Sequence, residues 1–130
     1  MSEGFTPRPR RTPGQSHGYG HDGANLATEI GLLRARIATV RERGRKAFQD
    51  GTETYDVACM VIIRLAALLE REDLARYLTA VTEEERRAIR TTRNIAAHAG
   101  YRAMNAGLFW LAVTERVPEI LDRIEGGMAL

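Results

Sequence analysis

The stretch RTTRNIAAHAGY, residues 90–101, contains residue types suited to proton transfer and anion binding. His98 can accept and return a proton near neutral pH, because the unperturbed pKa of histidine lies there. Arg93 offers a planar fork of donors that keeps its charge at any physiological pH. Asn94 and His98 are four positions apart, so on a helix they share a face, with Arg93 one position to the side. On a helix, these three residues can border one pocket.

The pairing of arginine with histidine has a second interpretation. The chain contains 18 arginines, and about 0.4 arginine–histidine pairs at this spacing are expected by chance when roughly 2% of residues are histidine. A histidine near a helix C-terminus also interacts favourably with the helix dipole and can donate to a terminal carbonyl. The residue types alone therefore leave open an acid–base site or a stabilised helix end.

Apolar periodicity of helical type runs through most of the chain, and no strand-like alternation of useful length occurs. It predicts an all-α fold, an antiparallel bundle of four main helices with one short extra helix. The first helix carries a single apolar stripe that consists of Leu26, Ile30, Leu33, Ile37 and Val40. The predicted helices cover about residues 24–48, 55–71, 73–81, 82–99 and 105–125.

Local signals predict where these helices begin and end. Thr54 or Asp56 can cap the second helix, and Thr82 with Glu85 forms a capping-box pattern at the start of the helix that carries His98. Gly100 is placed to end that helix in the left-handed conformation. Pro118 is expected to bend or restart the last helix.

Residues 1–23 differ in composition, with three of the four prolines, five glycines and no apolar periodicity. This composition predicts a disordered arm followed by one domain over residues 24–130. His17 and His21 in the arm have a spacing that suits a metal only on a helix, and the flanking glycines argue against one. No metal site is expected.

The remaining composition is that of a globular protein, with 44% hydrophobic and 28% charged residues. The apolar runs are too short to span a bilayer, and the N-terminus lacks the apolar stretch of a signal peptide. Cys59 lies within an apolar run, which predicts a buried thiol. We therefore expect a cytoplasmic protein that does not enter membranes.

Two further features accompany the motif RNIAAHAGY: Trp110 and Pro118 follow it eight residues apart, and the upstream helix closes on RLAALLER with Glu70. This arrangement resembles the HEPN superfamily, and within it the HepT-like proteins encoded beside minimal nucleotidyltransferases. That family has an arginine, a polar residue, three mostly apolar residues, a histidine and a nearby tyrosine at a helix end. The resemblance covers about residues 24–125.

Two positions depart from the family pattern. The family usually has one residue between the histidine and the tyrosine, whereas Ala99 and Gly100 both precede Tyr101 here. Leu69 stands where the family often has a glycine before the glutamate. Gly100 is flexible enough to absorb an extra residue.

The resemblance implies a metal-independent endoribonuclease that needs no cofactor and cleaves RNA by attack of its own 2′-hydroxyl. In that chemistry His98 would exchange the proton, Arg93 would stabilise charge on the phosphate oxygens, and Asn94 would orient His98 or hold a phosphate oxygen. The resemblance also implies a homodimer with the two motifs across a cleft. It further implies a toxin role, with a partner nucleotidyltransferase antitoxin that silences the nuclease by attaching AMP to Tyr101.

An alternative from another class is a non-catalytic HEPN helical module that binds and regulates, or neutralises, the partner nucleotidyltransferase. Both interpretations involve a second chain. The apolar stripe on the first helix or an exposed part of the second helix can supply the dimer interface.

Arg64 interrupts the apolar run VIIRLAALL and needs an explanation. A buried lone charge is costly, so its guanidinium must be paired or face a cleft. Glu70 is six positions further on and lies on a different part of the helix, so it is not an automatic partner. Arg64 is therefore a candidate phosphate ligand. The resemblance, through its match to the family's glutamate, makes Glu70 a candidate supporting residue.

Overall fold

The structure is a computed structural model that describes residues 17–99 and 104–128. It is all-α, as predicted, and the described residues contain no strand. The α-helices are α1 (His17–Arg43), α2 (Glu53–Leu69), α3 (Glu83–Asn94), α4 (Ala106–Leu111) and α5 (Val117–Met128). The shorter elements are the 3-10 turns η2 (Arg45–Ala47) and η3 (Glu72–Tyr77) and the π-helical turns η4 (Ile95–Ala99) and η6 (Ala112–Arg116).

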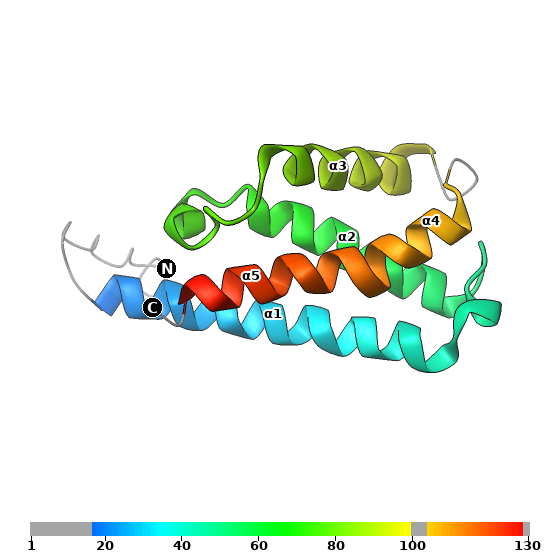
Figure 1. The fold of residues 1–130 in the computed structure, drawn as a ribbon, viewed down its shortest axis with the longest axis horizontal. Helices are drawn as coiled ribbons and strands as arrows, with labels where there is room; N and C mark the ends of the chain where they lie inside the picture. Colours follow the sequence, from blue (N-terminus) through cyan, green and yellow to red (C-terminus); the bar gives the residue numbers. More distant parts are fainter. Residues whose placement is uncertain (1–16, 100–103, 129–130) are drawn as a thin grey trace, which may run out of the picture.

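Successive long elements run in opposite directions and form an antiparallel bundle (Figure 1). α4, η6 and α5 follow one another as a single bent rod that lies along α1. α2 packs between α1 and α3. This arrangement confirms the predicted bundle, with η3 as the short extra element.

The apolar stripe of α1 is buried in the core, as its spacing predicted. The side chains of Leu26, Ile30, Leu33, Ile37 and Val40 are at most 2% exposed. The helix ends where Gly44 adopts a φ of 85° and donates to the carbonyls of Val40 and Arg41.

The beginning of α1 differs from the prediction. The helix starts at His17, so the predicted arm extends too far along the chain, and residues 1–16 of that arm lie outside the described part. His17 and His21 are both on the helix, contrary to the argument from their flanking glycines. Extending an existing helix costs much less than starting one, which lets α1 continue past these glycines.

An aromatic cluster fills the end of the bundle where α1, α2 and α4 meet. Phe48 lies at its centre, with its ring centroid 4.9 Å from Tyr55, 5.5 Å from Phe109 and 5.3 Å from Trp110. Phe109 and Trp110 are therefore core anchors. Cys59 is buried too, as expected.

The cap of α2 lies outside the two predicted positions. Thr52 is the N-cap, and its side chain accepts from the backbone N–H of Tyr55. Thr54 is instead inside the first turn, only 2% exposed, and donates to the carbonyl of Ala47. The prediction of Thr54 or Asp56 was wrong because the helix starts at Glu53, earlier than its apolar pattern.

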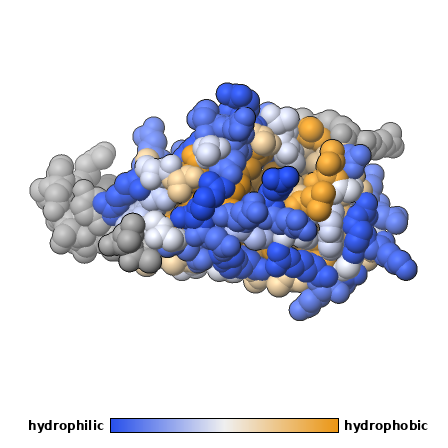
Figure 2. All heavy atoms as spheres, viewed as in Figure 1, coloured by the Kyte–Doolittle hydropathy of each residue, from blue (hydrophilic) through white to orange (hydrophobic). Residues whose placement is uncertain are grey.

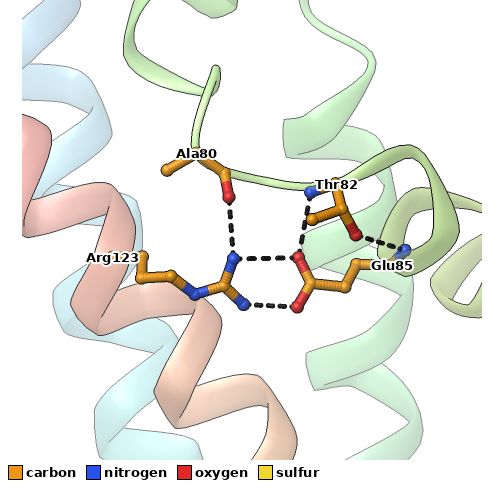
Figure 3. A network of polar contacts seen from close by, with 4 residues as sticks. All are labelled: Ala80, Thr82, Glu85 and Arg123. Carbon is orange, nitrogen blue, oxygen red and sulfur yellow. Dashed lines mark hydrogen bonds and ion pairs between the residues drawn. The ribbon is translucent and has the colours of Figure 1, made fainter.

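The start of α3 is anchored by a polar network (Figure 3). Thr82 and Glu85 form the predicted capping box, with backbone-to-side-chain distances of 3.0 and 2.9 Å. Arg123 of α5 donates to both carboxylate oxygens of Glu85 and, at 2.7 Å, to the carbonyl of Ala80. This network ties α3 to α5.

Pro118 affects the last helix through the turn that precedes it. Proline lacks the N–H that would reach the carbonyl of Thr114 in an α-helix, and its ring crowds that carbonyl. The chain widens there into the π turn Ala112–Arg116, and the guanidinium of Arg41 on α1 donates to the Thr114 carbonyl. The bend predicted at Pro118 is therefore a π turn, and a side chain from α1 supplies the hydrogen bond that its Thr114 carbonyl accepts.

None of the described helices combines the length and apolar character needed to cross a bilayer.

Candidate functional site

Arg93 and Asn94 form the last α-helical residues of α3, and their side chains contact each other. Nε of Arg93 donates to Oδ1 of Asn94 at 2.9 Å. Nη2 of Arg93 lies 4.0 Å from Oε2 of Glu70, at the C-terminal end of α2. The structure thus brings together three of the predicted site residues, Arg93, Asn94 and Glu70, from two helices. The Arg93 side chain remains 30% exposed, which leaves it accessible to a ligand.

The backbone of His98 lies within the π turn Ile95–Ala99, which follows α3. In a π turn hydrogen bonds join residues five apart, whereas in an α-helix they join residues four apart. The backbone that carries His98 therefore differs from the α-helix that was predicted to continue to Ala99. π turns are rare in proteins, and those that do occur are frequently found at functional sites. The His98 side chain, Gly100 and Tyr101 lie outside the described part of the structure.

Arg64 belongs to another surface of the molecule. Its guanidinium makes a two-point contact with Glu29 of α1, with Nε–Oε1 at 3.4 Å and Nη2–Oε2 at 2.8 Å. The charge is paired, as the physical argument required, but by a partner 35 positions away. Among the described residues Arg64 has no contact with Arg93, so the structure does not join it to the same site.

Two arginines that the sequence reasoning did not select lie beside the motif. Nε of Arg90 is 3.8 Å from the same Glu70 oxygen that Arg93 faces. Arg86 donates to the carbonyls of Leu69 and Leu78 at 2.8 and 3.0 Å, and so joins α3 to the end of α2 and to η3. The spacing of residues 86, 90 and 93, four and then three, is a helical-face signal that could have revealed them.

An apolar groove lies on the other side of α3, between that helix and the rod formed by α4, η6 and α5. Figure 2 shows hydrophobic side chains exposed on this face. The groove has a volume of 340 Å³. Ile62 of α2 and apolar residues of α3, η6 and α5 line it, together with the charged side chains of Glu84, Glu85, Arg116 and Glu119. Leu108 and Leu111 of α4 do not line this groove, but they add apolar surface elsewhere on the rod and are 68% and 44% exposed. This surface is apolar enough to attract a binding partner.

Of the two predicted dimer surfaces, the apolar stripe of α1 is buried within the chain, and the exposed part of α2 remains accessible. The α1 stripe is fully used within one chain, so it cannot also cover a second copy. This half of the prediction was wrong because the stripe packs against α2 and the C-terminal rod. On the other predicted surface, α2 leaves Met60 42% exposed.

Within the described residues, no group of three or more histidine, cysteine, aspartate or glutamate side chains is arranged to hold a metal ion. No protein-family model, curated protein or solved structure matches the chain.

Proposed function

We propose that this protein is a metal-independent endoribonuclease, the toxin of a HEPN/nucleotidyltransferase toxin–antitoxin system that acts in the cytoplasm. The observation that carries the proposal is the placement of Arg93. Its Nε donates to Asn94, its guanidinium faces Glu70, and it lies one residue before the π turn that includes His98. The sequence motif and its resemblance to the HepT-like family support the same conclusion.

The proposed reaction needs no group from outside the protein and the RNA. The 2′-oxygen of a ribose attacks the adjacent phosphorus as its proton passes to His98, and the bond from phosphorus to the 5′-oxygen breaks. His98 then returns the proton to the departing 5′-oxygen, which leaves a cyclic phosphate and a free hydroxyl. Arg93 neutralises the charge that develops on the phosphate oxygens. The hydrogen bond from Arg93 to Asn94 holds the guanidinium in place for this contact.

Regulation by a partner chain is part of the proposal. Transfer of AMP from a cognate nucleotidyltransferase to Tyr101 would place a phosphodiester close to Arg93 and compete with RNA. A homodimer would bring two such sites together. The proposal for Tyr101 rests on the sequence resemblance alone.

The second candidate function is a non-catalytic module that binds and regulates a nucleotidyltransferase. The apolar groove beside α3 favours it, because exposed apolar surfaces of this kind are typical of protein interfaces. This candidate requires no chemistry from His98.

Induced expression of the chain without its partner separates the two candidates. The nuclease proposal expects growth arrest with RNA degradation, and both effects disappear in His98→Ala and Arg93→Ala. Purified protein in excess chelator should cleave RNA, and loss of His98 should lower the rate by roughly 10²–10⁴-fold. Harmless expression of wild type, with RNA left intact by the purified protein, would contradict the nuclease and favour the binding module.

Modification of Tyr101 has its own test. Incubation of the wild-type chain with the partner and ATP should add at least one AMP mass, detected by intact-protein mass spectrometry. The Tyr101→Phe variant should gain none. An equal gain in that variant would place the modification on another residue.

A further inference from the structure

Two arginine side chains on α3 converge on one point of the protein surface. Nε of Arg90 lies 3.8 Å and Nη2 of Arg93 lies 4.0 Å from the same oxygen, Oε2 of Glu70. Residues three apart on a helix are neighbours on its surface. The Glu70 carboxylate thus occupies a position between two guanidinium groups.

The Glu70 carboxylate is held only loosely at this position. Both distances exceed the 2.7–3.2 Å range of an N–H···O hydrogen bond. The carboxylate is 53% exposed, and the Arg90 side chain is 45% exposed. Exposed ion pairs contribute little to stability, so Glu70 can turn into solvent at small cost.

The other two arginines of α3 are placed differently. Arg86 uses its guanidinium on two backbone carbonyls and is thereby committed to the fold. Arg87 is exposed and lies three positions before Arg90, but it is turned about a third of the helix circumference away from Arg93. Among the described residues, the ion pairs to Glu70 come from Arg90 and Arg93. Convergence on a common anion position is therefore specific to Arg90 and Arg93 within this helix.

We propose that Arg90 and Arg93 bind one phosphodiester group of the nucleic-acid substrate between them, at the position that Glu70 occupies in the free protein. This inference rests on the proposed function, because it names a substrate-binding residue at the same site. Guanidinium groups match the geometry of phosphate oxygens and form strong charge-assisted hydrogen bonds with them. Arg90 contributes affinity that does not depend on the bases, and Glu70 competes with the phosphate.

The test measures binding of a short single-stranded oligothymidylate, which lacks the 2′-hydroxyl and cannot be cleaved by the proposed reaction. Fluorescence anisotropy gives the affinity at several salt concentrations. Arg90→Gln should weaken binding roughly three- to tenfold at low salt and reduce the slope of log affinity against log salt by about 0.7. Arg87→Gln is the matched control, since it removes the same charge from the same helix, and its slope should stay close to that of wild type. Glu70→Gln should bind about threefold more tightly.

A cleavage assay completes the experiment. Arg90→Gln should lower kcat/KM at least as much as it weakens binding of the oligothymidylate, because Arg90 contacts the same phosphate that Arg93 holds during cleavage. If wild type cleaves no RNA but the salt slope still falls in Arg90→Gln alone, the nuclease proposal fails and the phosphate site stands. If Arg90→Gln and Arg87→Gln give equal slopes, the inference about Arg90 is wrong whether or not RNA is cleaved.

Discussion

The two ends of α3 are held in different ways. At its start, Thr82, Glu85 and Arg123 form a closed network of hydrogen bonds that joins α3 to α5 (Figure 3). At its end, Arg93 faces Glu70 at 4.0 Å, and the helix widens into a π turn. The first end fixes the helix in the fold, whereas the second leaves charged groups accessible. Substitutions at the start should therefore change stability, and substitutions at the end should change activity.

The largest expected effect is on activity, at the end of α3. Arg93→Lys keeps the charge but loses the planar fork and the Nε that donates to Asn94. RNA cleavage should fall by roughly 10²–10³-fold, which is the usual cost of removing one donor to a developing oxyanion. Initial rates of cleavage of a labelled RNA measure this effect.

Arg87→Lys provides the control for that substitution, as an exposed arginine of the same helix. It should leave the cleavage rate unchanged, and both variants should unfold at the wild-type temperature. A large loss of stability in Arg93→Lys would contradict the division between the two ends of α3.

The next largest effect is on stability, at Arg86. Arg86→Met leaves the carbonyls of Leu69 and Leu78 without their charged donor. The free energy of unfolding should fall by about 1.5–3 kcal/mol, the range for hydrogen bonds to charged groups. Urea denaturation followed by circular dichroism measures the change, with Arg87→Met as the control that loses only an exposed guanidinium. Equal destabilisation in the two variants would exclude a role for these backbone contacts.

The capping box should contribute less. Thr82→Ala removes the oxygen that accepts from the N–H of Glu85, which costs about 1 kcal/mol for a typical N-cap. For a chain of this size, the melting temperature should fall by about 3–5 °C. The exposed Thr79 provides a matched Thr→Ala control. Activity of the Thr82 variant should persist below its melting temperature.

The smallest effect depends on pH. The pKa of Glu85 lies below its ordinary value of 4.5, mainly because Arg123 donates to the carboxylate, while partial burial opposes the shift. A lowered pKa in the folded state means that the carboxylate stabilises the fold above the unfolded pKa and that this stabilisation is lost as the pH falls through the folded value. Melting temperatures of wild type and Glu85→Gln should therefore differ at pH 7 and converge in acid. The exposed Glu84 supplies a control, and a difference that grows in acid would contradict the assignment.

The sequence predicts those parts of the fold that are decided by residues close together along the chain. The stripe from Leu26 to Val40 and the pair Thr82 and Glu85 identify a buried face and a helix start directly, because spacing alone decides both. The two π turns could not be predicted in this way. The turn at Ala112–Arg116 depends on Arg41 from another helix as well as on Pro118, and IAAHA has no residue that excludes an ordinary α turn.

The candidate site was predictable to a similar degree. The motif itself identifies Arg93 and Asn94, and the structure adds the contact with Glu70. The pairing of Arg64 with Glu29 joins residues 35 positions apart, and no local spacing predicts which carboxylate reaches a given guanidinium. The motif around His98 does not identify Arg90, whereas the spacing of residues 86, 90 and 93 along one face of the helix does.

The hydrogen bond between Arg41 and the carbonyl of Thr114 has a consequence for how the first and last helices dock. Apolar stripes alone specify which helices meet but discriminate poorly between positions one helical turn apart, a slide of about 5.4 Å. Such a slide would carry Arg41 away from the carbonyl that Pro118 leaves without an α-helical donor, and a buried acceptor would lose its partner. Pro118 therefore helps to set the helix register: it makes one axial position of α1 against the last helix more favourable than the positions one turn away.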